Sequence, residues 1–362
     1  MAEIHLDHVA HSYLPRQMTS ADWALKELDH VWEDGAAYAL LGPSGCGKTT
    51  LLNVISGLIS PSQGQVRFDG RDVTTMKTEH RNIAQVFQFP VIYDTMSVYD
   101  NLAFPLRNRG IDEATVRDRV LEVAEMLDLA EDLRKRALGL PADAKQKISL
   151  GRGLVRSDVA AILFDEPLTV IDPHLKWQLR RKLKQIHDRY KLTLIYVTHD
   201  QNEALTFAEK VAVMYEGAVL QVGTPQELFE APAHRFIGYF IGSPGMNFLP
   251  CELTGDGARV AGQTVVLPPG VPARAGKAAT LEIGIRPEAV SLAEDGAGDG
   301  GGLAAQVRGV EDLGSCKIVT CRLDDYEIKV KVPEDQPVPP DRCALSFNRD
   351  LTLLYADGRL VD

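Results

Sequence analysis

A complete phosphate-binding pattern near residue 42 constrains this chain more than any other feature of its sequence. The spacing GxxxxGK[ST] is satisfied by eight consecutive residues: Gly42, Pro43, Ser44, Gly45, Cys46, Gly47, Lys48 and Thr49. An apolar run, 38–41, precedes the pattern and a largely apolar segment, 50–55, follows it, so a strand should enter the loop and a helix should leave it. Glycines let backbone N–H groups approach a polyphosphate at the start of that helix. The spacing therefore predicts a nucleotide triphosphate site in an α/β fold.

Individual residues of this pattern have predictable roles toward ATP and Mg²⁺. Lys48 should reach the β- and γ-phosphates, and the Thr49 hydroxyl should be a ligand of Mg²⁺. Cys46 lies inside the loop, where a packing role is expected, and Thr50 continues the nucleotide site into the helix. Because four fixed positions occur by chance in roughly one chain in a hundred of this length, the flanking segments must support the interpretation.

Two further apolar runs end in residues that suit phosphoryl chemistry. The run 160–164 is followed by Asp165 and Glu166, as expected for a buried parallel strand whose carboxyl end meets a ligand. Asp165 should hold Mg²⁺, directly or through water, and Glu166 should polarise the attacking water. The run 192–198 ends at His199, a candidate γ-phosphate sensor at the end of a third strand of this type. The alternatives are an ordinary acidic turn and a structural histidine.

The order of these segments resembles the nucleotide-binding subunits of ABC transporters over essentially the whole chain. The phosphate loop is followed by Val-Phe-Gln at 86–88, Asp-Glu-Pro at 165–167, Asp172 and Thr-His-Asp at 198–200. The resemblance implies that Gln88 contacts Mg²⁺ and relays the nucleotide state to membrane subunits. It places the aromatic platform for adenine at Tyr13, and it places Asp172 in a loop that crosses between two nucleotide sites. Tyr13 also fits an ordinary strand residue.

One motif of the family is altered in this chain. The signature Leu-Ser-Gly-Gly-Gln falls, by the register of the helix that follows it, on Leu140, Pro141, Ala142, Asp143 and Ala144. In the family this segment offers a hydroxyl and glycine N–H groups to the γ-phosphate bound on the opposite subunit of a head-to-tail dimer. Pro141 has neither group, and Ala142 and Asp143 restrict a backbone that glycine leaves free to approach.

The altered signature predicts an asymmetric assembly. Asp143 brings negative charge toward the partner's polyphosphate, and two unit charges 4 Å apart repel by about 4 kcal/mol at an effective dielectric of 20. The site that this segment completes should therefore hydrolyse ATP poorly. Because a homodimer would carry the change in both sites, we expect a heterodimer with a second ATPase that has an intact signature. The alternative is that Pro141–Ala144 rearranges and still functions.

The sequence divides into two domains near residues 243–245. Residues 1–243 alternate strand-like and helix-like segments, and they predict an α/β ATPase core with a mixed sheet and an antiparallel β subdomain. The stretch 89–155 should form a helical subdomain, which in the resembled family meets the membrane subunits. Residues 244–362 contain short strand-like runs separated by Gly, Pro and Asp turns, which predict an all-β domain.

The strand-like runs of this second domain are 264–267, 279–285, 304–310, 317–322, 327–332 and 344–347. Segments 283–288 and 310–315 resemble the oligonucleotide-binding-like (OB-like) regulatory domain of importer ATPases for sugars and related solutes. In that family the domain stabilises the ATPase dimer or receives regulatory signals. The run Ser-Pro-Gly-Met-Asn at 243–247, together with the altered signature, resembles the paired-ATPase importers for glycerol or glycerol phosphate.

Composition fits a peripheral subunit of a membrane complex. No run of about 18 apolar residues is present, and the first residues lack the basic start of a secretory signal. The net charge of −11 argues against a nucleic-acid surface but leaves a local basic patch open. The resemblance implies two multi-pass permeases, an extracytoplasmic solute-binding protein and a location at the cytoplasmic face of the inner membrane. Two alternatives are a non-hydrolytic structural subunit and a soluble ABC ATPase of repair or translation, although no tandem or coiled-coil insertion is visible.

Overall fold

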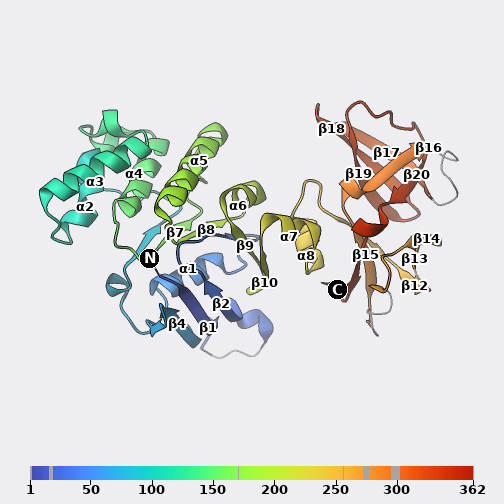
Figure 1. Cartoon of the computed structure of the whole chain (residues 1–362), viewed down its shortest axis with the longest axis horizontal. Coiled ribbons are helices and arrows are strands. Elements are labelled where there is room, and N and C mark those ends of the chain that lie inside the picture. Colours follow the sequence, from blue (N-terminus) through green and yellow to red (C-terminus); the bar gives the residue numbers. More distant parts are fainter. Residues whose placement is uncertain are drawn as a thin grey trace. The chain divides into compact units, whose positions relative to one another are not determined.

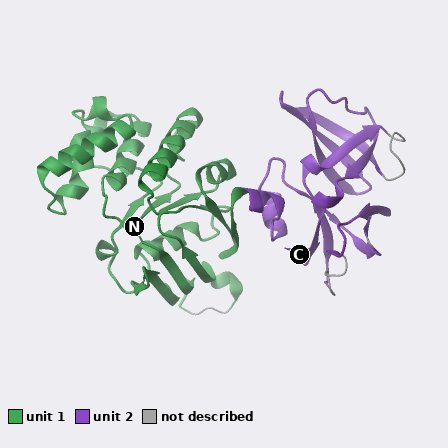
Figure 2. Ribbon diagram, in the orientation of Figure 1, with its two compact units in different colours: residues 1–225 green, residues 226–362 purple. Residues whose placement is uncertain are grey.

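The computed structural model describes residues 2–15, 19–169, 171–255, 257–271, 278–294 and 302–361. The chain divides into two compact units, residues 1–225 and 226–362 (Figure 2). Each unit has its own cluster of buried hydrophobic side chains. The domain boundary predicted at residue 243 lies inside the second unit, shortly after helix α8 (Arg235–Phe240).

A six-stranded sheet forms the centre of the first unit (Figure 1). Its strands in spatial order are β10 (Ala218–Gly223), β9 (Lys210–Tyr215), β3 (Ala37–Leu41), β8 (Leu194–Thr198), β7 (Ala161–Asp165) and β6 (Ile83–Val86). The pairings are parallel except at the edge, where β10 is antiparallel to β9. Every residue of β3, β7 and β8 is buried, as expected when both faces of a parallel sheet are covered. The three apolar runs of the sequence thus form adjacent strands whose carboxyl ends meet at one edge.

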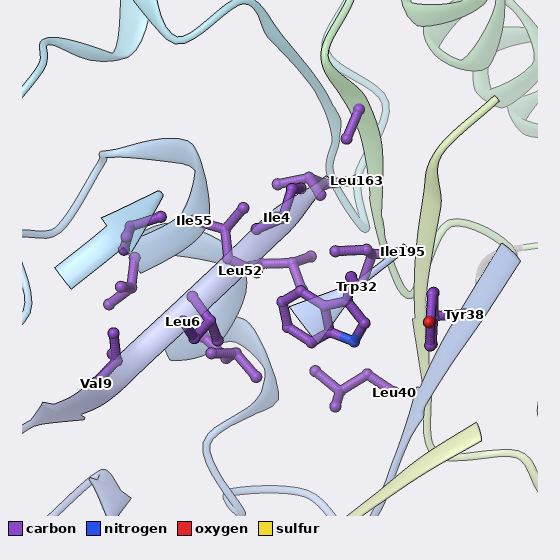
Figure 3. Close-up of a cluster of buried hydrophobic side chains, with 14 of the residues drawn as sticks. Ile4, Leu6, Val9, Trp32, Tyr38, Leu40, Leu52, Ile55, Leu163 and Ile195 are labelled. Carbon is purple, nitrogen blue, oxygen red and sulfur yellow. The ribbon is translucent and has the colours of Figure 1, made fainter. Parts of the chain in front are cut away.

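A second, antiparallel sheet completes the core of this unit. It contains β2 (Leu25–Trp32), β1 (Ile4–His11), β4 (Gln63–Phe68) and β5 (Arg71–Asp72). Helix α1 (Lys48–Ser56) shares the buried cluster with both sheets, as Figure 3 shows. Leu52 and Ile55 of α1 are fully buried, as are Ile4 of β1 and Leu163 and Ile195 of the central sheet. Packing against both sheets therefore fixes α1 and the phosphate loop at its start.

The remaining helices of the first unit follow the predicted order. Helices α2 (Val98–Arg107), α3 (Glu113–Met126) and α4 (Ala142–Leu154) lie within 89–155, where the helical subdomain is predicted. Helices α5 (Pro173–Tyr190) and α6 (Gln201–Phe207) follow β7 and β8, and α7 (Pro225–Glu230) begins at the division between the units. Short 3-10 helices occur at Ser20–Asp22, Thr78–His80, Ala130–Asp132, Ala137–Gly139, Pro287–Ala289 and Arg349–Leu351.

The described part of the second unit beyond α8 is built from three antiparallel sheets. One contains β11 (Asn247–Pro250), β15 (Leu281–Ile285), β21 (Leu353–Ala356) and β22 (Arg359–Leu360), and a small one contains β12 (Glu252–Thr254), β13 (Gly257–Val260) and β14 (Gln263–Val266). The third contains β16 (Val290–Glu294), β20 (Arg342–Phe347), β17 (Leu303–Asp312), β18 (Cys316–Leu323) and β19 (Tyr326–Pro333). Each of the six predicted runs overlaps one of these strands. The predicted fold class, an α/β core followed by an all-β domain, is confirmed.

Candidate nucleotide site

The phosphate loop connects the carboxyl end of β3 to the first turn of α1, and its glycines are required sterically. Gly47, the N-cap of α1, has φ of +104°, a region that side-chain-bearing residues rarely adopt. A Cβ atom on Gly47 would lie 2.4 Å from the Ala24 carbonyl oxygen. A Cβ atom on Gly42 would lie 2.3 Å from the Met214 carbonyl oxygen. The loop is therefore held close to neighbouring backbone by positions that accept only glycine.

Lys48 lies beneath this loop with its charged end directed at the loop's own backbone. Its Nζ donates to the carbonyl oxygens of Gly42 at 2.8 Å and Pro43 at 2.9 Å. The residue is only 5% exposed, so its ammonium group is held in a shielded position where it interacts strongly with an anion. Cys46 belongs to the core cluster, and burial raises the pKa of its thiol. A neutral, buried thiol suits the packing role predicted for Cys46.

Thr49 and Asp165 form a pair of oxygen donors next to the loop. The Thr49 hydroxyl donates to Asp165 Oδ1 at 3.2 Å, which joins the first turn of α1 to the end of β7. Burial raises the pKa of Asp165, and the negative charge of Glu166 acts in the same direction. A hydroxyl and a carboxylate are hard oxygen ligands of the kind that Mg²⁺ prefers. A bound cation would offset the cost of keeping the Asp165 carboxylate ionised, so the two residues fit the metal.

Glu166 and His199 face each other at the carboxyl ends of β7 and β8. Glu166 Oε2 lies 2.9 Å from His199 Nδ1, and the glutamate side chain is the more buried of the two. Glu166 has φ of +47°, an uncommon backbone conformation for a residue with a side chain. Residues held in this region cost about 1–3 kcal/mol and cluster at active sites. The hydroxyl of Thr169 donates to the Glu166 carbonyl at 3.1 Å and supports the turn.

One pocket of about 310 Å³ is lined by part of the loop, by Lys48 and Thr49, and by Glu166. Its lining comprises Tyr13, Ala24, Ser44, Gly45, Gly47, Lys48, Thr49, Thr50 and Glu166. The Tyr13 hydroxyl is 3.1 Å from the Thr50 hydroxyl, while the residue remains 63% exposed. The imidazole of His11 packs edge-on against the Tyr13 ring with centroids 4.7 Å apart. An exposed aromatic ring at the rim and a cation below the loop suit a base and its phosphates, respectively.

Other predicted site residues lie outside this pocket in the described structure. Gln88 follows β6, whose Val86 pairs with Phe164, so it lies near the same carboxyl edge of the sheet as Asp165. Asp172 caps α5 by accepting the backbone N–H of His174 at 3.0 Å. The segment 140–144 leads into α4, for which Pro141 is the N-cap. The assignments of these residues to nucleotide contacts depend on a partner or a bound state and remain predictions.

A buried polar network behind His199 was not predicted from the sequence. Glu203 on α6 is 5% exposed and accepts hydrogen bonds from the Tyr196 hydroxyl at 3.0 Å and the Thr198 hydroxyl at 2.9 Å. Lys176 Nζ lies 3.7 Å from the same carboxylate. Because Thr198 immediately precedes His199, this network fixes the end of β8 and the position of the histidine. The signal in the sequence was an acid four residues after the histidine, at the start of a helix.

Comparison with known proteins identifies the family. A family model described as ABC transporter matches residues 25–169, one described as MalK OB fold domain matches 242–290, and one described as TOBE domain matches 283–354. The sn-glycerol-3-phosphate import ATP-binding protein UgpC of Chromobacterium violaceum is 36% identical over 359 residues, covering 98% of this chain and 94% of that protein. This chain belongs to the ABC transporter ATP-binding proteins. It thus binds and hydrolyses ATP in connection with transport, as predicted, and its second unit contains the OB and TOBE domains.

Other ABC proteins show the same relationship. The trehalose import ATP-binding protein SugC of Mycobacterium tuberculosis (strain H37Rv) is 42% identical over 291 residues, which is 80% of this chain and 72% of SugC. The solved structure of cbiO1 from Clostridium perfringens, part of the ABC transporter complex cbiONQ, has 26% identity and a TM-score of 0.57. It covers 63% of this chain and 90% of its own. Among the described residues of this ABC protein, no helix is long and apolar enough to cross a membrane.

Proposed function

We propose that this ABC protein powers the import of a carbohydrate or polyol, with glycerol or glycerol 3-phosphate as the first candidates. The relatives named for trehalose and for sn-glycerol-3-phosphate import support this solute class. The observation that carries hydrolysis is the Glu166–His199 pair, whose glutamate lines the same pocket as Lys48. A carboxylate at that position can activate a water molecule for attack on the γ-phosphate. The phosphate loop would hold that phosphoryl group within reach of the water.

The proposed reaction depends on positioning and charge stabilisation. Lys48 holds the phosphates, Glu166 orients and polarises the attacking water, and His199 hydrogen-bonds the glutamate and senses the γ-phosphate. Thr49 and Asp165 would hold Mg²⁺, with Gln88 completing its environment. The bound cation would neutralise charge that develops on the phosphate oxygens. Tyr13 would stack on the adenine ring.

An asymmetric pair of ATPases fits the start of α4. Pro141 at the N-cap has no backbone N–H, and Asp143 stands in the first turn of the helix. Helix N-termini favour anions, and a carboxylate built into the first turn already satisfies part of that preference. We therefore propose that the partner is a second ABC ATPase with an intact signature. The site that the partner's signature completes would hydrolyse ATP, and the site completed by residues 140–144 would bind ATP with little turnover.

Exposed aromatic and aliphatic side chains beside Gln88 support docking to membrane subunits. Phe87, Phe89, Val91 and Tyr93 are all exposed, and Phe89 has 67% of its surface accessible. Four large apolar side chains within seven residues form a surface that a protein partner would cover. We propose that they contact two permeases at the cytoplasmic face of the inner membrane. An extracytoplasmic solute-binding protein would deliver the solute.

Affinity purification of the tagged chain from detergent-solubilised native membranes tests this assembly. Mass spectrometry should identify two permeases and a second ATPase, whose signature can then be read directly. Recovery of this chain as the only ATPase would contradict the heterodimer. Uptake of labelled glycerol, glycerol 3-phosphate and trehalose by cells with and without the gene would then identify the solute.

The variant Glu166→Gln separates the catalytic subunit from a non-hydrolytic one. We expect it to remove most ATP turnover and transport by the purified complex, while ATP binding persists. The altered signature is the feature that favours the alternative, a subunit that binds ATP for structural reasons. Unchanged transport by Glu166→Gln would establish that alternative and overturn our proposal.

A further inference from the structure

Strands β17, β18 and β20 lie side by side in one sheet of the second unit (Figure 1). Three arginines on these strands, Arg308, Arg322 and Arg342, line one hollow of that sheet. Gln306 of β17 pairs directly with Arg322 of β18 and with Arg342 of β20, so these three residues form a row across adjacent strands. Arg308, further along β17, donates to Gln306 Oε1 at 3.0 Å. All four residues are exposed. The alternate residue Ala305 faces the buried core, which assigns the row to the solvent face.

The positive charge of the three arginines is weakly balanced within the described structure. Arg322 donates to the Asp324 backbone carbonyl at 2.7 Å and lies 3.4 Å from the Asp325 carboxylate. The side chains of that ion pair are 52% and 85% exposed, so the pair is of the kind that contributes little. Among the described residues no carboxylate forms an ion pair with Arg308 or Arg342. A bound anion would balance the positive charge that these arginines bring to one face of the sheet.

The arginines surround a hollow large enough for a small ligand. Its volume is about 520 Å³, and Ala304, Ala305, Gln306 and Asp324 complete its lining. Ala304 pairs with Ala344 on β20, and these small side chains leave room above the strands. Arg322 and Arg342 are separated by two strand spacings, roughly 10 Å, which is enough to place a tetrahedral anion over Gln306. Small-molecule sites have volumes in the same range, whereas nucleic acids need a longer basic track.

We propose that this arginine hollow binds a phosphoryl group, either as inorganic phosphate or as the phosphomonoester of a small metabolite. Guanidinium groups match phosphate oxygens with paired hydrogen bonds, which makes arginine more suitable here than lysine. Asp324 also lines the hollow. Its carboxylate would accept a hydrogen bond from a hydroxyl of a polyol phosphate, and its charge disfavours an extended polyanion. The hollow is separate from the nucleotide pocket, so the proposal goes beyond transport and gives the OB and TOBE domains a ligand of their own.

Calorimetric titration of the full-length protein tests the hollow directly. The nucleotide site is first saturated with a non-hydrolysable ATP analogue and Mg²⁺, so that added phosphate cannot enter the phosphate loop. Inorganic phosphate and glycerol 3-phosphate are titrated separately. We expect saturable binding at one site per chain, weakened about tenfold or more by Arg342→Gln, with Arg308→Gln acting in the same direction. Tighter binding of the ester would indicate a phosphorylated metabolite, and tighter binding of inorganic phosphate would indicate free phosphate.

The matched control is Arg259→Gln, which removes the same charge from an exposed position on β13, in the same unit but outside the hollow. It should leave phosphate affinity unchanged. Far-ultraviolet circular dichroism and the melting temperature report whether each variant folds. No saturable binding, equal weakening by Arg259→Gln, or full binding by Arg342→Gln in a folded protein would overturn the proposal. Preference for a polyglutamate peptide or a single-stranded oligonucleotide over both phosphates would overturn it as well.

Discussion

Helix α1 begins at the end of the phosphate loop, and helix α4 begins in the segment to which we assign the altered signature, but the two helix starts differ chemically. The N-cap of α1 is Gly47 in a left-handed conformation, and Lys48 follows it. The N-cap of α4 is Pro141 in an extended conformation, and Asp143 stands in the first turn. Helix dipoles favour anions at both places. Under our proposal, loop backbone and neighbouring charges make one helix start a phosphate site and not the other, because the dipole is common to both.

Removal of the cation at the start of α1 should have the largest effect. Lys48→Ala should lower ATP affinity about 100-fold or more, because charge-assisted hydrogen bonds contribute about 1.5–3 kcal/mol each. Fluorescent-nucleotide titration measures the change, with Lys77→Ala as an exposed control. If a folded Lys48→Ala protein bound ATP as tightly as the wild-type protein, the cation at the start of α1 would not explain how α1 differs from α4.

Restoration of the signature should make the start of α4 resemble a functional one. In the complex with its partner, the combined change Pro141→Ser, Ala142→Gly, Asp143→Gly and Ala144→Gln should raise turnover in the site completed by this segment about tenfold. Nucleotide trapping resolved by site is the measurement. Gly139→Ala is a suitable control, because an added Cβ there meets no atom within 4 Å. Unchanged trapping would mean that Pro141 and its neighbours do not limit hydrolysis.

The pH dependence of Mg²⁺ binding tests the proposed role of Asp165, the acid beside α1, as a metal ligand. The pKa of Asp165 is raised by burial, so its carboxyl group retains a proton to a higher pH than an exposed aspartate. Apparent Mg²⁺ affinity should therefore rise several-fold as pH increases through that raised value and then level off. The same shift makes the folded state bind the proton more tightly, so this group's contribution to stability falls as pH rises through the window. An Asp165→Asn protein should lose this pH dependence. If its Mg²⁺ affinity followed the same pH profile as the wild-type protein, Asp165 would not be the group that controls Mg²⁺ binding.

The smallest effect is expected from Asp143→Asn alone. Loss of one negative charge should improve ATP affinity of the composite site two- to threefold, since exposed charges are screened. The same change should lower the free energy of unfolding by about 0.3–1 kcal/mol, because an acid in the first turn stabilises the helix. Equilibrium denaturation and nucleotide titration measure the two effects. If Asp143→Asn instead raised the free energy of unfolding and lowered ATP affinity, Asp143 would not be an acid that stabilises α4 and repels the nucleotide.

Local patterns predicted the fold class, and many of the residues that they singled out line one pocket. The phosphate-loop spacing and the acids and histidine after apolar runs were readable because strand ends and helix starts carry their own sequence signals. The support for the site was not readable. Glu203 contacts Tyr196 and Thr198 across a strand–helix packing, and the left-handed backbone of Glu166 arises from the fold around it. Such features depend on tertiary contacts, which no local spacing encodes.

Helix α1, which follows the phosphate loop, also links nucleotide binding to the stability of the first unit. Because Leu52 and Ile55 of α1 are buried with side chains of both sheets, the loop cannot lose its shape without disturbing the core of residues 1–225. A nucleotide at 100 times its dissociation constant would thus add about 2.7 kcal/mol to the unfolding free energy of that unit. The second unit, with a separate core, would not share the gain directly. In a melting experiment, the melting temperature of the first unit would therefore report how much ATP is bound.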